Sequence, residues 1–211
     1  MTNPFLEFLR PHKTVPQTPW TAKSRWDLNP SRTGVLFFGL FIFGLGDSLL
    51  IQSTIGNAPW SVLAQGVSDQ LDITMGWSTF AISTLVLLLW IPLRERPGFG
   101  TISNIVVIAA AIQIGVSFFP QQSNYLVGVI YCLLGIAMVG FGSALYITCG
   151  LGPGPRDGLM TALHNRSGIR IGRVRLGIEG SVLVAGWLLG GTVGLGTLLF
   201  ALLIGQSIAV S

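Results

Sequence analysis

The stretch GLGPGPRDGL, residues 150–159, follows a long apolar run and places several glycines and prolines around an Arg-Asp pair. Proline is favoured in the first turn of a helix, because the amide hydrogen that it lacks would have no partner there. Asp157 in that turn suits the positive end of the helix dipole. The stretch therefore predicts that one apolar helix ends near residue 149 and that a short helix, over 154–166, begins just beyond it.

A second copy of this pattern lies 96 residues earlier, at TIGNAP, residues 54–59. Aligning residues 35–115 with 131–211 without a gap gives 19 identical pairs out of 81, roughly three times the number that chance would give for this composition. An internal duplication is the simplest cause. It predicts a short helix over 58–71 as the partner of the one over 154–166.

The composition indicates an integral membrane protein. Half of the 211 residues are apolar, 9% are charged and the mean hydropathy is +0.68, a balance that soluble domains do not show. A helix needs roughly 17 to 25 apolar residues to cross a bilayer core. Six runs come close to that length, at about 35–55, 78–93, 101–119, 125–149, 176–191 and 195–211.

The expected fold is an all-α membrane protein of six transmembrane helices, arranged as two inverted-topology three-helix repeats, each with a short helix after its first span. The chain divides into a basic N-terminal tail (1–34), repeat 1 (35–119) and repeat 2 (125–211). Three crossings are an odd number, so the second repeat enters the bilayer from the opposite side. Inverted repeats of this kind are typical of transporters.

The twelve Lys and Arg residues lie in three segments: the tail, the second loop and the fourth loop. These segments share one side of a six-helix chain, so the positive-inside rule predicts that both termini are cytoplasmic. No Lys/Arg run with interleaved aromatic residues is present, and we therefore expect no nucleic-acid partner. The expected partners are the lipid bilayer and a small-molecule solute, and a homo-oligomer stays open.

Asp47 is the leading candidate for a functional residue. It lies about 18 Å into its helix at 1.5 Å per residue, near the middle of the bilayer. An aspartate at that depth costs about 2.5 to 3.5 kcal/mol on insertion scales and marks a site by default. The alternative is that Asp47 only bonds a neighbouring helix. Gln52, about one turn further on, is its expected companion.

Further candidate substrate-binding residues lie at the two junctions, where a helix N-terminus offers unpaired amides and about half a positive charge to an anion. They are Asn57, Pro59, Gly152, Pro155, Arg156 and Asp157. The alternative is that the short helices lie on the membrane surface. Glu179 is a last candidate, although Arg175 four residues earlier makes a structural ion pair the favoured reading.

The run GSALYITCGLGPGPRDGLMTAL, residues 142–163, with GIRIGRVR at 168–175 and Glu179 beyond it, resembles the YczE group of YitT-like bacterial membrane proteins. The resemblance covers about residues 33–211. It implies a bacterial plasma-membrane protein with six helices and says little about a substrate.

The favoured function is a small secondary transporter that moves a small anionic or zwitterionic organic solute. The alternative is a membrane scaffold that docks a cytoplasmic partner through its basic loop. No Ser-His-Asp arrangement, metal-ligand spacing or phosphate loop occurs in the sequence, so we expect neither an enzyme nor a cofactor.

Overall fold

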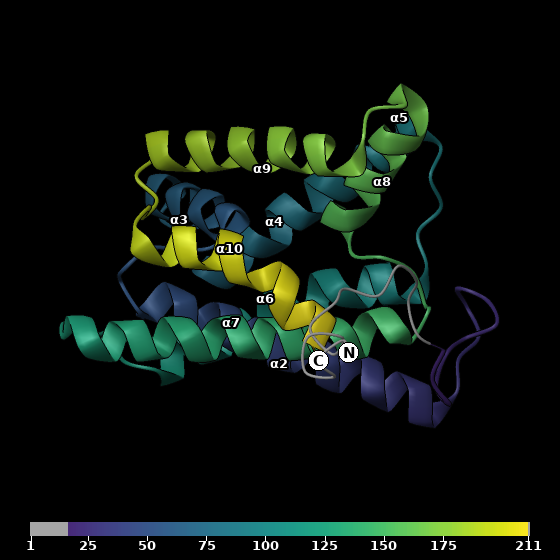
Figure 1. Cartoon of the computed structure of the whole chain (residues 1–211), viewed down its shortest axis with the longest axis horizontal. Helices are drawn as coiled ribbons and strands as arrows, with labels where there is room; N and C mark the ends of the chain where they lie inside the picture. Colours follow the sequence, from purple (N-terminus) through teal and green to yellow (C-terminus); the bar gives the residue numbers. More distant parts are fainter. Residues whose placement is uncertain (1–16, 211) are drawn as a thin grey trace, which may run out of the picture.

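The computed structural model describes residues 17–210, with side chains described to residue 208 (Figure 1). All regular secondary structure in this range is helical. The helices are α2 (Pro30–Gln52), α3 (Pro59–Leu71), α4 (Met75–Leu88), α5 (Trp90–Leu93), α6 (Phe99–Phe118), α7 (Tyr125–Thr148), α8 (Pro155–Ser167), α9 (Ile171–Leu188) and α10 (Leu195–Val210). Helix α2 thus begins inside the segment that the sequence assigns to the tail.

Four helical segments of the described chain are long and apolar enough to cross a membrane. They are α2, α6, α7 and the segment Met75–Leu93, which comprises α4 and α5. The expected fifth and sixth spans correspond to α9 and α10. Helix α9 carries Arg173, Arg175 and Glu179 within its 18 residues, and the apolar part of α10 is shorter, at Leu195–Ile208.

Helices α2 and α7 cross closely at the centre of the bundle because glycines face each other at the contact. A Cβ atom on Gly142 would lie 2.5 Å from the carbonyl oxygen of Gly39, and one on Gly135 would lie 2.6 Å from that of Gly46. Side chains at these positions would force the helices apart. Helix α6 packs on the other side of α2, and α10 packs on α7.

Residues 96 positions apart, which we call counterparts, share backbone features throughout the described chain. The eight described residues with positive φ form four counterpart pairs: Thr54 with Gly150, Gly56 with Gly152, Asp72 with Gly168, and Arg94 with Gly190. Helices α3 and α8 also begin and end at counterpart residues. The two halves of the chain therefore follow the same local path.

Contacts between the halves are reciprocal as well. The amide of Gly100 donates to Leu151 O at 2.9 Å, and its counterpart Gly196 donates to Ile55 O at 2.9 Å. At the helix ends, Gln70 Nε2 donates to Leu189 O, and its counterpart Arg166 donates to Leu93 O. The two halves thus contact each other through counterpart residues.

The short helices α3 and α8 begin inside the bundle. Pro59 and Trp60 are buried at the start of α3, and Pro155 is fully buried at the start of α8. Figure 1 shows α3 and α8 at opposite ends of the long axis of the molecule. The sequence left open whether these helices turn inward or lie on the membrane surface. The burial of their first turns favours the inward arrangement.

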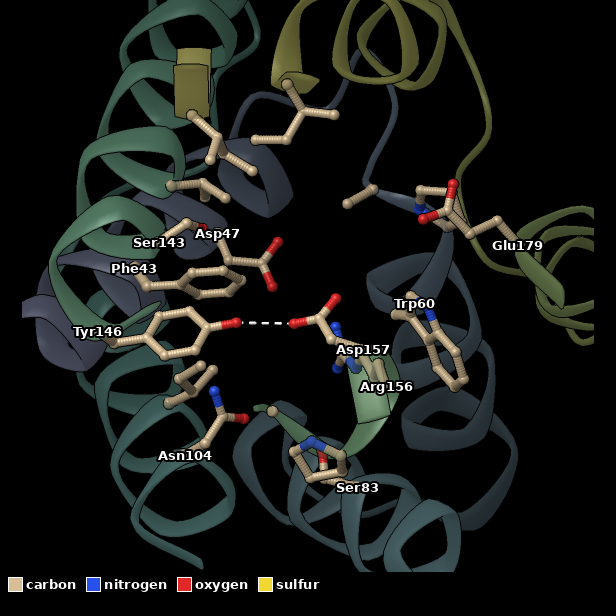
Figure 2. Close-up of a pocket in the computed structure, with 18 of the residues that line it drawn as sticks. Phe43, Asp47, Trp60, Ser83, Asn104, Ser143, Tyr146, Arg156, Asp157 and Glu179 are labelled. Carbon is tan, nitrogen blue, oxygen red and sulfur yellow. Dashed lines mark hydrogen bonds between the residues drawn. The ribbon is translucent and has the colours of Figure 1, made fainter. Parts of the chain in front are cut away.

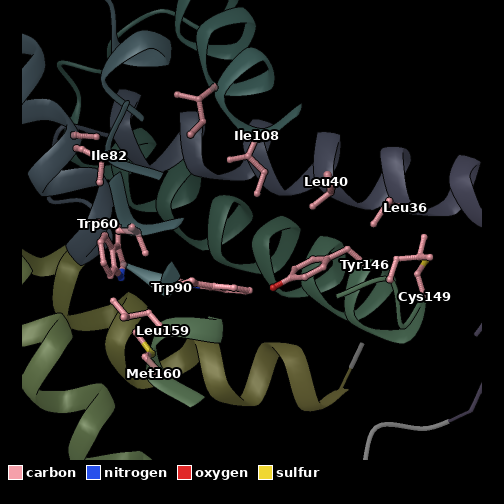
Figure 3. Packing of buried hydrophobic residues seen from close by; sticks show 14 of the residues in the cluster. Leu36, Leu40, Trp60, Ile82, Trp90, Ile108, Tyr146, Cys149, Leu159 and Met160 are labelled. Atoms are coloured by element: carbon pink, nitrogen blue, oxygen red, sulfur yellow. The ribbon is translucent and has the colours of Figure 1, made fainter. Parts of the chain in front are cut away.

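The main hydrophobic cluster surrounds these first turns (Figure 3). Trp90 is 2% exposed, and its indole N–H donates to Pro155 O at 3.0 Å. Its ring covers Gly158, where a Cβ atom would lie 2.0 Å from the ring. Trp90 therefore fixes the start of α8 against the neighbouring helices.

Candidate functional site

A cavity of about 120 Å³ lies where the first turns of α3 and α8 meet the middle of α2 and α7 (Figure 2). We call it the central cavity. By comparison with the size of a water, it has room for several waters or one small solute. Its lining comprises Phe43, Asp47, Ala58, Pro59, Trp60, Ser83, Asn104, Ile108, Val139, Ser143, Tyr146, Ile147, Gly154, Pro155, Arg156, Asp157, Met160, Arg175, Glu179, Phe200, Ile204 and Ile208.

The lining includes both members of eight counterpart pairs. They are Phe43/Val139, Asp47/Ser143, Ala58/Gly154, Pro59/Pro155, Trp60/Arg156, Ser83/Glu179, Asn104/Phe200 and Ile108/Ile204. In several of these pairs one member carries a charge or an amide group and its counterpart carries neither. Counterpart positions of the two halves thus line the cavity together, and the differences between them give it its polar groups.

Asp47 is buried, with 2% of its surface exposed, and its only described hydrogen-bond donor is Ser61 on α3. The Ser61 hydroxyl lies 2.8 Å from both carboxylate oxygens. One hydroxyl satisfies a small part of the accepting capacity of a carboxylate. Asp47 therefore keeps capacity for a further donor on the cavity side.

Asp157 presents a second carboxylate to the cavity. The Tyr146 hydroxyl donates to Asp157 Oδ2 at 2.7 Å, and the Asp157 side chain is exposed. Figure 2 shows the carboxylates of Asp47 and Asp157 directed toward the same central space. Asp157 lies in the first turn of α8 and leaves part of its side chain uncovered by the rest of the described chain.

Arg156 supplies the positive charge. Its guanidinium carbon lies 5.0 Å from the centroid of the Trp60 ring, within the range of a cation–π contact. The two ion pairs among the described residues are Arg32–Asp27 and Arg175–Glu179, so Arg156 is in neither. It is half-buried and forms no hydrogen bond with the described part of the chain.

Other polar groups of the lining also lack protein partners. Asn104 is 9% exposed, and its side chain takes part in no hydrogen bond among the described residues. A Cβ atom on Gly154 would lie 3.1 Å from its amide nitrogen. The indole N–H of Trp60 is buried without a partner. Buried polar groups are normally paired, so the Asn104 amide, which lines the cavity, is available to a guest there.

Arg175 and Glu179 form the i,i+4 ion pair that their spacing predicts, with Arg175 Nε 2.8 Å from Glu179 Oε1. Both residues line the central cavity from α9. The pair is formally neutral.

Three of the candidate residues lie outside the cavity lining. Gln52 donates to Val116 O at 2.8 Å and to Phe119 O at 2.5 Å, at the end of α6. It is five positions beyond Asp47, and five residues turn a helix by about 140° beyond a full revolution. The spacing therefore aims Gln52 away from the space that Asp47 faces.

Asn57 and Gly152 belong to the junctions rather than to the lining. Asn57 Nδ2 donates to Gln65 Oε1 at 2.7 Å, and its own amide oxygen is buried without a partner. Gly152 has φ of +113°, and a Cβ atom there would lie 2.8 Å from Thr101 Oγ1. Among the nine candidates, the structure brings together Asp47, Pro59, Pro155, Arg156, Asp157 and Glu179 at the cavity.

Local sequence patterns alone do not point to Tyr146, Trp60, Ser61 or Asn104 as parts of the site. Trp60 and Ser61 are the counterparts of Arg156 and Asp157, so the repeat itself carried a signal for them. Tyr146 lies in an apolar run where an aromatic residue is ordinary. No group of His, Cys, Asp and Glu suited to a metal ion occurs within residues 17–210.

These features define a multi-pass helical membrane protein with a polar cavity inside its bundle. The chain belongs to the family of unknown function DUF6198, whose sequence model matches residues 30–211, and it is a YczE-like protein. The resemblance noted in the sequence is thereby confirmed.

Relatives occur in Haemophilus influenzae and in Bacillus subtilis. The chain is 45% identical over 194 residues to an uncharacterized protein of Haemophilus influenzae, covering 92% of this chain and 89% of the relative. It is 34% identical over 171 residues to the uncharacterized membrane protein YczE of Bacillus subtilis, covering 80% of both chains. It is 28% identical to the Bacillus subtilis protein YyaS over 178 residues, covering 82% of this chain and 88% of the relative. No solved structure matches the chain.

Proposed function

We propose that this protein is a small secondary transporter that moves a small anionic or zwitterionic organic solute across the bacterial plasma membrane. In this proposal the two halves are inverted repeats, six segments cross the bilayer, and both termini are cytoplasmic. The observation that carries it is the central cavity, which both halves line with counterpart residues at the meeting point of two inward helix N-termini.

The inverted arrangement is supported by the reciprocal contacts between the halves and by the paired backbone turns. In an inverted pair, the two halves can exchange conformations. A state that opens one end of the cavity then has a two-fold-related state that opens the other end. A cavity lined by counterparts on both sides is the position where such a change gives access from either side. The orientation is supported by the cations, which gather in the tail, the second loop and the fourth loop.

The transport role is supported by unpaired charge and polarity at the centre of an apolar bundle. Asp47, Arg156 and Asp157 lie near one another without forming an ion pair, and the Asn104 side chain faces the same space. A purely structural cluster would neutralise its charges internally, because unpaired buried charges are costly. A solute that pairs with them is therefore the natural occupant.

Uptake into proteoliposomes tests the proposal. Purified protein is reconstituted, and entry of radiolabelled glycine and of radiolabelled acetate is compared with entry into protein-free vesicles. We expect at least one solute to enter faster with protein present, and Asp47→Asn or Arg156→Gln to abolish that difference. Matched controls are Asp69→Asn and Arg173→Gln, which change exposed residues away from the lining and should transport normally.

Protein-dependent entry that survives both cavity substitutions would overturn the assignment of the site. Entry no faster than in protein-free vesicles, for both solutes, would overturn transport of this solute class and favour the membrane scaffold.

A further inference from the structure

The central cavity carries groups of both signs, which narrows the class of solute that fits it. Arg156 is half-buried without an ion pair, and the side-chain amide of Asn104 takes part in no hydrogen bond with a described residue. These donors form a pole suited to a carboxylate. Asp47 and Asp157 each receive one hydroxyl donor and form a pole suited to an ammonium group.

The balance of charge decides between an anion, a cation and a zwitterion. The three charged side chains Asp47, Asp157 and Arg156 sum to one negative charge, since the Arg175–Glu179 pair is neutral. Each helix N-terminus at the cavity, those of α3 and α8, adds about half a positive charge. The empty cavity is thus close to neutral as a whole. A monovalent anion or cation would leave uncompensated charge, whereas a zwitterion would leave none.

The size of the cavity limits the solute further. A closed apolar cavity of about 150 Å³ accepts benzene, which has six heavy atoms. The central cavity has about 120 Å³. A solute of about five or six heavy atoms fits that space, which is the size of the smallest amino acids.

We infer that the central cavity binds a zwitterion of glycine size, with the carboxylate held by Arg156 and Asn104 and the ammonium group held between Asp47 and Asp157. This inference rests on the proposed function for its physiological meaning, and it names the solute class. It also gives Asn104 a substrate-binding role. Tyr146 positions the Asp157 carboxylate through its 2.7 Å hydrogen bond.

Binding to purified protein in detergent tests the inference separately from transport. The probes are glycine, acetate and methylammonium, which carry both charges, the negative charge alone and the positive charge alone. Affinity is measured by thermal shift and by isothermal titration calorimetry. We expect glycine to bind at least about tenfold more tightly than either single-charge probe, because each charge-assisted contact contributes about a factor of ten.

Variants separate the two poles. Asn104→Leu removes the amide donor and should weaken glycine binding by about tenfold, and Asp47→Asn should weaken it similarly by removing the carboxylate that faces the ammonium group. Asn165→Leu changes an exposed asparagine on α8 and serves as the matched control that should bind normally. Asn104→Asp keeps the volume of the side chain but replaces the amide donor with an acid that repels a carboxylate, so a loss of binding there reports the chemistry of this position rather than the fold.

Acetate or methylammonium binding as tightly as glycine would overturn the zwitterion assignment, and so would glycine binding that Asn104→Leu leaves unchanged. The absence of binding by all three probes would overturn it as well. Transport can fail independently: glycine that binds but is not taken up into proteoliposomes would support the site and contradict the transporter. Acetate uptake without glycine binding would support the transporter and contradict the zwitterion site.

Discussion

Gly158 gives Trp90 the space to cover the start of α8. A Cβ atom at Gly158 would lie 2.0 Å from Trp90 Cζ2, and the ring is held by its hydrogen bond to Pro155 O. We predict that Gly158→Ala destabilises the protein by about 1 to 3 kcal/mol, as overpacking of a tight core does. Thermal unfolding in detergent measures the loss.

Gly180→Ala is the matched control for this change. Gly180 lies in helix α9, and a Cβ atom there meets nothing within 4 Å. Alanine is the better helix former by about 0.5 to 1 kcal/mol, so stability should stay level or rise. Equal destabilisation by both variants would show that contact with Trp90 is not the cause.

Sequence alone could predict the charged members of the site, because a charge or a proline in an apolar run is conspicuous. Asp47 and Arg156 were candidates for that reason, and both line the cavity. Tyr146 could not be recognised, since an aromatic ring in an apolar helix is ordinary until its hydroxyl is seen to meet Asp157. Gln52 is close to Asp47 in sequence but turns about 140° away from it around the helix, and its amide bonds the end of α6.

At the scale of elements, the junctions before α3 and α8 turn the chain inward. Gly152 has φ of +113°, and a Cβ atom there would meet Thr101 Oγ1 at 2.8 Å. Its neighbour Gly150 has φ of +67° and ordinary contacts near 3.5 Å, and its counterpart Thr54 already carries a side chain in that conformation. A side chain can therefore be accommodated at Gly150 but not at Gly152.

We predict that Gly152→Ala destabilises the protein by about 1 to 3 kcal/mol, the typical cost of a side chain in a strained backbone conformation. Gly150→Asn should cost less, because asparagine tolerates the left-handed region. Chemical or thermal unfolding of both variants checks the order. A larger loss from Gly150→Asn would contradict this account of the junction.

The N-terminal strap, residues 17–29, is tied to α2 by Arg32. The Arg32 guanidinium donates to the backbone oxygens of Trp20, Thr21 and Asp27, and it pairs with the Asp27 carboxylate at 2.9 Å. The backbone N–H of Lys23 and the charge of Arg32 hold the pKa of Asp27 below its usual value. The carboxylate form is thus the one that the folded strap favours.

A lowered pKa gives this part of the fold a defined pH dependence. The contribution of Asp27 is complete above the pKa of an unfolded aspartate and is lost as pH falls through the lowered folded value. Hydrogen exchange of the strap amides, corrected for intrinsic rates, should therefore show protection that decreases in that acidic range. Asp27→Asn should remove this pH dependence, and an unchanged profile in the variant would assign it to another group.

The short helices were the best-predicted elements, because proline marks the first turn of each and the repeat fixes both at once. Their observed starts, Pro59 and Pro155, lie within one residue of the expected ones. Their inward placement could not be predicted from local sequence. It depends on close approach of α2 and α7 and on partners such as Trp90, which are distant along the chain.

For the whole molecule, the decisive question is whether the two halves enter the bilayer in opposite directions. Counterpart residues at the outer ends of α3 and α8 should then lie on opposite faces of the membrane. Leu71 and Ser167 are such a pair, and both are exposed. By the positive-inside rule, the cations near Ser167 predict a cytoplasmic position for that end of α8, whereas the segment after α3 has no cation.

We predict that Leu71→Cys is labelled by a membrane-impermeant maleimide on intact spheroplasts, and that Ser167→Cys is labelled only in inside-out vesicles. The wild-type chain is the control, because Cys132 and Cys149 are both fully buried and should not react. Labelling of both engineered thiols from the same face would mean that the repeats are parallel. The reciprocal contacts between the halves would then have no symmetry across the membrane, and the central cavity could not be exposed alternately to its two sides.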